Sequence, residues 1–262
     1  MDLGIRGRKA IVNGGSAGIG KSAALALARE GCEVVVSARG EERLRAACED
    51  IARETGSRVT PVAADHSSAE GRERILAVCP EPDILVGTCA PPPMTPDFRK
   101  IDEAQWRTAI DISLLGPIEF MKAVVDGMAE RRWGRIVNIA TVAAKYPHEI
   151  RILSGSTRAA LANYAVAVSK VVAKHNVTIN TLLPGMHYTA TVDELFSARA
   201  EARGITFEQE VAEFIEQWNI ASGTFGDPDD AGAIVAMFCS ERAKYVTGQC
   251  LVIDGGATNS TF

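Results

Sequence analysis

The sequence predicts an α/β protein built on one doubly wound sheet of about seven parallel strands, with helices on both faces. Short apolar runs alternate with helical patterns along the 262 residues, and the runs show no in/out alternation. Parallel strands have this character because helices bury both faces of their sheet. No repeat, linker or change in composition divides the chain. We therefore expect a single domain over residues 1–262.

Each predicted element follows from a local pattern. Strands are expected where short apolar runs occur, at 9–12, 34–36, 58–64, 83–86, 135–139, 177–182 and 249–253. Helices are expected at 21–28, 41–54, 68–78, 102–128 and 153–174. The last of these helices is nearly uncharged, so we expect it to be buried.

An amphipathic stretch at about 189–223 interrupts this alternation of strands and helices. Its apolar positions include large side chains, and its polar positions are largely acidic. A membrane-surface helix and a substrate lid both fit the apolar pattern, but the acidic residues favour the lid. Residues expected either to line an apolar pocket or to pack between helices are Met186, Tyr188, Phe196 and Trp218.

The overall composition argues against several classes of partner. The formal net charge is −5 with no basic cluster, which disfavours nucleic acid. No apolar run approaches the ~18 residues of a membrane span, and the first residues lack the pattern of a secretory leader. The six cysteines are scattered without a C-x-x-C pair. They are typical of reduced core residues in a cytoplasmic protein, and not of disulfides or a metal site.

A glycine-rich turn joins the first predicted strand to the first predicted helix. Gly14, Gly18 and Gly20 permit a tight turn, and the start of the helix presents backbone N–H groups to a phosphate. The residues expected to bind nucleotide phosphates are Gly14, Ser16, Ala17, Gly18, Ile19 and Gly20. A purely structural turn is the alternative interpretation.

Residues after the next two strands extend this predicted site, because ligands of such sheets bind at the carboxyl ends of the strands. Ser37 and Arg39 follow the second strand, where an acidic residue would favour NAD. Arg39 suits the 2′-phosphate of NADP by its charge and its fork of donors, so we expect NADP(H) in preference to NAD(H). A solvated arginine is the alternative. Asp65, after the third strand, is expected to accept from the adenine amino group or to cap the next helix.

Further motifs carry a resemblance to a known family over nearly the whole chain. They are Gly14-x-x-x-Gly18-Ile19-Gly20, Asp65, the strand 134–139, Asn180 with Pro184-Gly185, Gly226-Asp227-Pro228, and Val246-Thr247-Gly248-Gln249 leading to Asp254-Gly255-Gly256. The sequence resembles the short-chain dehydrogenase/reductase family. The resemblance implies a Rossmann-type sheet, an NAD(P) cofactor, a small-molecule substrate and a homotetramer or homodimer.

The catalytic positions depart from the pattern of that family, which uses a serine, a Tyr-x-x-x-Lys pair and an asparagine. Thr141 stands at the serine position, and Ser154 and Arg158 stand at the tyrosine and lysine positions. Ser113 stands at the asparagine position. The resemblance also places Ala90 in the cofactor-binding turn after the fourth strand.

These replacements change the expected chemistry. Ser154 alone is a poor general acid, because its hydroxyl is much less acidic than a phenol, but it can donate a hydrogen bond to a carbonyl. Arg158 can hold the nicotinamide ribose and supply positive charge, but it does not exchange protons at neutral pH. Thr141 keeps a hydroxyl that can polarise a substrate oxygen. Ser113 is shorter than asparagine and would weaken a water relay.

The loop after the fifth predicted strand offers other proton donors. A divergent branch resembling acyl-carrier-protein reductases also carries Lys-x-Pro before a Ser-x-x-x-Arg pair, as Lys145, Ser154 and Arg158 do here. Lys145 could protonate an oxyanion if its pKa is lowered, and a solvated lysine is the alternative. Tyr146 and His148 are expected to contact substrate, with a catalytic role less favoured.

The segment after the sixth strand completes the predicted site. Pro184 and Gly185 match the cofactor loop of the family, and Thr189 is expected to donate to the nicotinamide carboxamide or to a phosphate. His187 is expected to act mainly through its backbone. The residues expected to bind substrate in this segment are Met186, His187 and Tyr188.

Three functions are compatible with these residues. The first is an NADP(H)-dependent oxidoreductase that interconverts a carbonyl and a secondary alcohol on a fairly apolar small molecule or an acyl thioester. The second is a catalytically inactive nucleotide-binding protein or regulatory subunit, which the missing tyrosine and lysine favour. The third is a non-redox enzyme on the same fold, which the open glycine turn disfavours.

Overall fold

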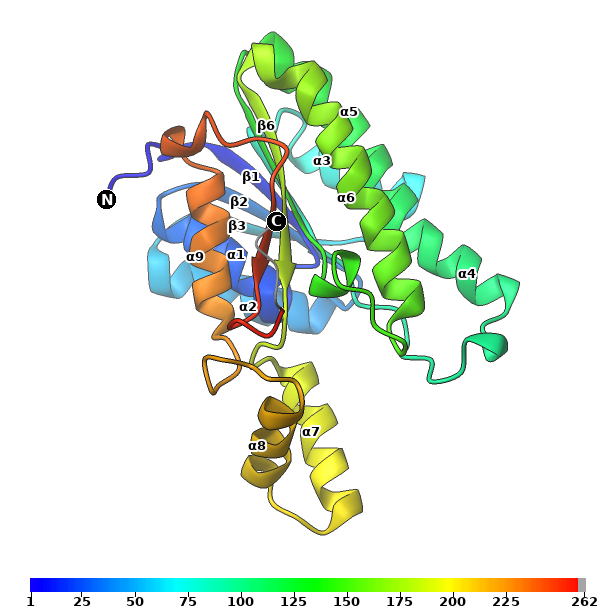
Figure 1. The fold of residues 1–262 in the computed structure, drawn as a ribbon. Helices are drawn as coiled ribbons and strands as arrows, with labels where there is room; N and C mark the ends of the chain where they lie inside the picture. Colours follow the sequence, from blue (N-terminus) through cyan, green and yellow to red (C-terminus); the bar gives the residue numbers. More distant parts are fainter. Residues whose placement is uncertain (259–262) are drawn as a thin grey trace.

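The computed structural model describes residues 1–258 and contains a seven-stranded sheet (Figure 1). The strands are β1 (Lys9–Asn13), β2 (Glu33–Ala38), β3 (Val59–Ala63), β4 (Ile84–Gly87), β5 (Gly134–Ile139), β6 (Val177–Pro184) and β7 (Cys250–Ile253). Their order across the sheet is β3-β2-β1-β4-β5-β6-β7, and every neighbouring pair is parallel. The predicted doubly wound parallel sheet is confirmed.

Helices lie on both faces of this sheet. They are α1 (Gly18–Arg29), α2 (Glu41–Thr55), α3 (Ala69–Val78), α4 (Glu103–Ile110), α5 (Gly116–Glu130), α6 (Ile152–Val172), α7 (Ala190–Arg203), α8 (Phe207–Gln217) and α9 (Pro228–Phe238). The helices α1, α2 and α9 cover one face, and α3, α5 and α6 cover the other (Figure 1). This layering explains why the strands are apolar on both sides.

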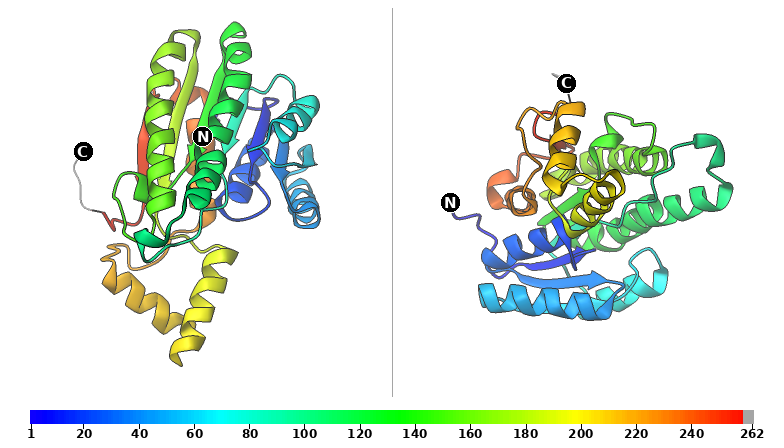
Figure 2. Two further views of the ribbon diagram at one scale, coloured as in Figure 1. Left: turned by 90° about the vertical axis from the view of Figure 1, so that its right-hand side faces the viewer. Right: turned by 90° about the horizontal axis from the view of Figure 1, so that it is seen from below.

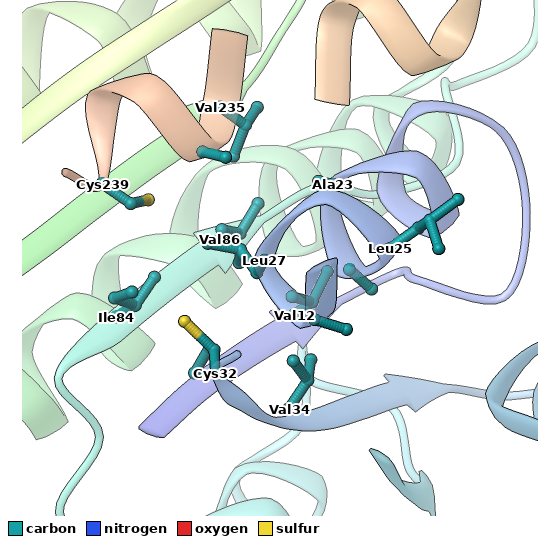
Figure 3. Close-up of a cluster of buried hydrophobic side chains, with 14 of the residues drawn as sticks. Val12, Ala23, Leu25, Leu27, Cys32, Val34, Ile84, Val86, Val235 and Cys239 are labelled. Carbon is teal, nitrogen blue, oxygen red and sulfur yellow. The ribbon is translucent and has the colours of Figure 1, made fainter. Parts of the chain in front are cut away.

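Two apolar clusters fill the space between the sheet and its helices. Val12 of β1 belongs to the cluster that includes Leu27 of α1 and Val235 of α9, as Figure 3 shows. The neighbouring Ile11 belongs to the opposite cluster, with Phe120 of α5. Successive residues of a strand point to opposite faces, so both positions must be apolar. The strands therefore contribute mainly apolar side chains to both faces of the sheet.

The structure refines the helical stretch predicted at 102–128. The helix α4 is followed by a π-helical segment, Asp111–Leu115, and then by α5. Pro117, in the first turn of α5, has no N–H to donate to the carbonyl of Ser113 four residues earlier, which favours a local change in the hydrogen-bond pattern. Ser113 is fully buried within this segment.

The helices α7 and α8 lie together at one end of the molecule, next to the carboxyl end of β6 (Figure 2). They confirm that the predicted amphipathic stretch is helical. Phe196 of α7 is fully buried, and its ring centroid lies 5.1 Å from Phe214 and 5.2 Å from Phe225. Phe196 therefore packs between helices and does not line a pocket. Within residues 1–258, no helix combines the length and the apolar character that a membrane crossing requires.

Candidate active site

The glycine-rich turn between β1 and α1 has no room for side chains. A Cβ on Gly14 would lie 2.6 Å from the carbonyl oxygen of Thr88, and a Cβ on Gly20 would lie 2.4 Å from that of Gly14. Gly14 and Gly18 have φ angles of 72° and 53°, which favour glycine. The helix α1 begins with no side-chain cap and no acidic residue in its first turn. The backbone of this turn therefore fits the phosphates of a dinucleotide.

Hydrogen bonds from the end of β2 hold the glycine-rich turn in place. The backbone N–H groups of Gly14 and Gly15 donate to the carbonyl of Ser37 at 2.8 and 3.2 Å. The hydroxyl of Ser37 donates to the side-chain oxygen of Asn13 at 2.7 Å. Ser37 is fully buried, so its side chain supports the turn, and its contact with a cofactor stays a prediction.

Replacing Gly20 with alanine is expected to disrupt this turn. The new Cβ would overlap the carbonyl of Gly14, so we expect the free energy of unfolding to fall by about 1–3 kcal/mol and nucleotide binding to be lost. Gly40→Ala is the matched control, because nothing lies within 4 Å of a Cβ at that position. Thermal unfolding and nucleotide titration of both variants test the prediction, and equal behaviour of the two would contradict it.

Polar groups gather where β2 and β3 end, at the predicted adenosine side of the site. Arg39 is exposed and, within residues 1–258, makes no hydrogen bond or ion pair. Asp65 accepts hydrogen bonds from the N–H and the hydroxyl of Ser67, at 2.9 and 2.6 Å. Burial alone would raise the pKa of Asp65, but these bonds and the charge of Arg39 hold it below its ordinary value. The corner thus carries an ionised carboxylate beside a guanidinium.

Two details of this corner differ from the sequence-based expectations. Asp65 does not cap α3, because the hydroxyl of Ser68 accepts from the N–H of Gly71 at 3.0 Å. His66, which sequence reasoning missed, has its Nε2 buried without a hydrogen-bond partner in the described part of the chain. Burial lowers the pKa of His66, so its imidazole is neutral at pH 7. An unsatisfied ring nitrogen beside Arg39 fits a site that receives a polar ligand.

The helix α6 brings Ser154 and Arg158 together one turn apart. Nη1 of Arg158 donates to Oγ of Ser154 at 2.6 Å, and both residues are 3% exposed. Because the hydroxyl oxygen accepts this bond, its own hydrogen remains available for another acceptor. The two residues that stand at the tyrosine and lysine positions of the family are therefore in direct contact.

Cys89, which lies just after β4, contacts the other side of the guanidinium of Arg158. Sequence reasoning missed this residue. Nη2 of Arg158 lies 3.3 Å from the carbonyl oxygen of Cys89 and 3.2 Å from its Sγ. The same sulfur lies 3.7 Å from the hydroxyl of Ser113. The only sequence signal for Cys89 is its position two residues after the end of β4, beside the predicted Ala90. Ser113, Cys89, Arg158 and Ser154 thus form one continuous polar chain.

Thr141 lies after β5, close to the start of α6. Its hydroxyl oxygen accepts from the N–H of Ala143 at 3.3 Å, so its hydrogen is also available. Gly155 allows the close approach of α6 to this segment, because a Cβ there would lie 2.8 Å from the carbonyl oxygen of Ala143. No hydrogen bond joins Thr141 to Ser154 in residues 1–258, so their cooperation stays a prediction.

The loop that follows Thr141 meets α8 rather than Arg158. Lys145 is exposed, and its Nζ lies 5.6 Å from the ring centroid of Tyr146. In the described chain it makes no hydrogen bond to Ser154, so its role as a proton donor stays a prediction. The ring of His148 stacks on Trp218 at the end of α8, with centroids 4.3 Å apart. This stacking joins the predicted substrate loop to the predicted lid.

The segment after β6 closes over the glycine-rich turn. The methyl group of Thr189 lies 3.2 Å from the position of a Cβ on Gly18, so the start of α7 touches the turn. Gly185 approaches Asp254 so closely that a Cβ would lie 2.7 Å from the Cβ of Asp254. Pro184 is the last residue of β6. These positions agree with the predicted cofactor loop, although their ligand contacts stay predictions.

The three predicted substrate residues of this segment point to different surroundings. His187 is 6% exposed, its Nδ1 lies 3.2 Å from the carbonyl oxygen of Gly185, and burial lowers its pKa. It therefore supports the loop as a neutral imidazole. Met186 packs on the apolar cluster of α7 and α8. Tyr188 is partly exposed, with its ring centroid 5.2 Å from Phe225. None of the three makes a hydrogen bond to Ser154 among the described residues.

The chain matches a family model described as enoyl-(acyl carrier protein) reductase over residues 14–258. The 3-oxoacyl-[acyl-carrier-protein] reductase FabG of Aquifex aeolicus is 28% identical over 262 residues, covering 98% of this chain and 99% of FabG. The human dehydrogenase/reductase SDR family member 4 is 30% identical over 251 residues, covering 94% of this chain and 86% of that protein.

A solved structure extends the similarity to three dimensions. The L-sorbose reductase of Gluconobacter frateurii, in complex with NADPH and L-sorbose, has a TM-score of 0.95 at 25% identity. The match covers 99% of this chain and 100% of that chain, so it includes the helices α7 and α8 as well as the sheet. The fold, the matched residues and these relatives lead to one conclusion: the chain belongs to the short-chain dehydrogenase/reductase family.

Proposed function

We propose that this protein is an NADP(H)-dependent oxidoreductase that interconverts a carbonyl and a secondary alcohol, with Ser154 and Arg158 in place of the usual tyrosine and lysine. The observation that carries the proposal is the 2.6 Å hydrogen bond from Arg158 to Ser154. This bond holds the guanidinium of Arg158 against the oxygen of Ser154, and it leaves the hydroxyl hydrogen of Ser154 available for a substrate oxygen. The names of the relatives, which are reductases and dehydrogenases, support activity on CH–OH groups.

The glycine-rich turn and Arg39 support the proposed cofactor, NADP(H). The glycine-rich turn would hold the pyrophosphate, and Arg39 would bind a 2′-phosphate. Thr88 connects this turn to the polar chain that includes Cys89 and Arg158, because it lies against Gly14 and directly precedes Cys89. Two similar structures support the choice of NADP(H): the L-sorbose reductase with NADPH, and a 3-oxoacyl (acyl-carrier-protein) reductase from Agrobacterium tumefaciens with NADP.

The residues of this chain would act on the substrate oxygen. Bound NADPH supplies the hydride. As negative charge develops on the carbonyl oxygen, the hydroxyl of Ser154 donates a hydrogen bond to it, and the positive charge of Arg158 stabilises it. Thr141 offers a second donor from the end of β5. Arg158 keeps its proton at neutral pH, so the proton that completes the alcohol comes from water or from Lys145.

The experiment that tests this proposal measures NADPH oxidation with a panel of ketones, aldehydes, oxo acids and β-ketoacyl thioesters. We expect turnover with at least one class, together with NADPH binding in a fluorescence titration. NADPH binding without turnover across the panel would favour the alternative, a nucleotide-binding protein without catalysis, which the missing tyrosine also suggests. Absence of NADPH binding would contradict both functions.

We also propose that the protein forms a homo-oligomer. The strand β7 lies at the edge of the sheet. The strand exposes Leu251, which is 38% exposed, and Tyr245, five residues before the strand, is 100% exposed. Exposed apolar groups at a sheet edge are typical of a surface that another subunit covers. Light scattering of the purified protein tests this proposal, and a monomer at micromolar concentration would contradict it.

A further inference from the structure

A second arginine lies at the start of α6, beside the catalytic pair. Arg151 directly precedes the first residue of the helix, three positions before Ser154 and seven before Arg158. Residues separated by three, four and seven positions lie on one side of a helix. Arg151, Ser154 and Arg158 therefore share the side of α6 that faces the site. Arg151 is partly buried.

No carboxylate in residues 1–258 balances these two guanidinium groups. Arg158 hydrogen-bonds only to neutral groups, the hydroxyl of Ser154 and the carbonyl and sulfur of Cys89. The side chain of Arg151 makes no hydrogen bond or ion pair within the same residues. The acid nearest in sequence, Glu149, is exposed and lies 3.6 Å from Nδ1 of His148. The site therefore carries an uncompensated positive charge in a protein of net charge −5.

Two further facts describe the electrostatics of this charged site. Burial lowers the pKa of Arg151, and so does the positive charge of Arg158, because like charges repel each other. The first turn of α6 contains no acidic residue, and no side chain caps it. The positive end of the helix dipole thus adds to the two guanidinium groups.

Arg135 is a buried arginine with a structural role, and its partners can be compared with the surroundings of Arg151. Its side chain is fully buried, and its nitrogens donate to the carbonyl oxygens of Ser240, Gly134 and Asn176 at 3.2, 2.8 and 2.9 Å. Its Nη2 also lies 3.8 Å from a carboxylate oxygen of Glu241. Arg151 has no such partners. A partly buried charge without a protein partner loses part of its hydration, so an anionic ligand is its natural partner.

We propose that Arg151, together with Arg158, binds a carboxylate of the substrate, and that the substrate is a small oxo acid or the corresponding hydroxy acid. This inference rests on the proposed reductase function. Arg151 lies three residues from Ser154, a rise of about 4.5 Å along the helix. That spacing suits a carboxylate one or two carbons from the reacting carbonyl, as in 2-oxo and 3-oxo acids. Neutral sugars and thioesters would leave the charge of Arg151 unmatched.

The kinetic test compares acids with their esters. Pyruvate and acetoacetate are assayed beside methyl pyruvate and methyl acetoacetate, in the wild type, Arg151→Gln and Arg107→Gln. We expect Arg151→Gln to lower kcat/KM for the acids by about 10–100-fold, because a charge-assisted bond is lost, and to leave the esters unchanged. Arg107, an exposed arginine paired with Glu103, is the matched control and should have no effect. Equal loss for acids and esters would overturn the inference.

A binding test separates this inference from the proposed function. 3-Hydroxybutyrate and 3-hydroxybutyramide are titrated calorimetrically into the protein, with and without NADPH, so that no turnover is needed. We expect the acid to bind at least about 10-fold more tightly than the amide, and Arg151→Gln to remove this difference. Equal affinities in the wild type would overturn the inference. If the acid binds selectively but no compound oxidises NADPH, the proposed reductase function fails while the anion site stands.

Folding of the variant is the remaining control. Arg151→Gln removes one of two repelling charges and no hydrogen bond, so its Tm should equal or exceed that of the wild type. A large decrease in Tm would show that Arg151 has a structural role and would count against the inference.

Discussion

Replacing Arg158 with leucine is expected to lower kcat by about 100-fold or more, because the substitution removes the positive charge next to the Ser154 hydroxyl, which we propose donates to the substrate oxygen. The variant also leaves the carbonyl of Cys89 and the hydroxyl of Ser154 without their shared donor. Leucine fills a similar space but can neither orient Ser154 nor stabilise an oxyanion. Steady-state NADPH oxidation with the best substrate of the panel measures the effect.

Arg158→Lys is the informative companion of this variant. Lysine keeps the charge but lacks the planar fork that reaches Ser154 on one side and Cys89 on the other. We expect a kcat between those of the wild type and Arg158→Leu. Circular dichroism and thermal unfolding show whether each variant is folded. A folded Arg158→Leu protein with wild-type kcat would refute the assigned role of Arg158.

Replacing Arg39 with alanine is expected to weaken NADPH binding by about 10–100-fold while leaving NADH binding nearly unchanged. Arg39 is exposed beside the ionised Asp65, and nothing in residues 1–258 pairs with its guanidinium through a hydrogen bond or salt bridge. A 2′-phosphate is present in NADPH and absent from NADH, so the ratio of the two dissociation constants isolates this contact. Fluorescence titration with each cofactor measures the ratio.

Arg58→Ala is the matched control for the cofactor prediction. Arg58 is an exposed arginine that pairs with Glu33 at the opposite ends of β2 and β3. Replacing Arg58 changes the net charge by the same amount as replacing Arg39, but it leaves the predicted adenosine site unchanged. Both variants should keep the wild-type Tm. If Arg39→Ala weakened NADPH and NADH by the same factor, the phosphate-binding role of Arg39 would be wrong.

The fold could be predicted from the sequence because its signals are local. Continuous apolar runs such as 34–36 specify strands buried on both faces, and the glycines from Gly14 to Gly20 mark a turn without room for a Cβ. The contact between Ser154 and Arg158 was also predictable, since residues four apart on a helix are neighbours. Each of these inferences depends on residues that are close in the chain.

The parts of the site that the sequence did not reveal depend on residues far apart in the chain. Cys89 meets Arg158 across 69 positions, and no periodicity links a strand end to a helix so distant. The stacking of His148 on Trp218 joins a loop to the end of α8 in the same way. Arg151 was missed for another reason: its importance lies in the absence of a partner, which only the packed structure displays.

The central claim is that a serine, oriented by an arginine, replaces the usual tyrosine in carbonyl reduction. Its most direct test is the kcat for NADPH oxidation by Ser154→Ala, measured beside Ser156→Ala, an exposed serine on the same helix. We expect kcat of Ser154→Ala to fall by about 100-fold with an unchanged NADPH dissociation constant, whereas Ser156→Ala keeps the wild-type rate. A Ser154→Ala variant as active as Ser156→Ala would contradict the claim.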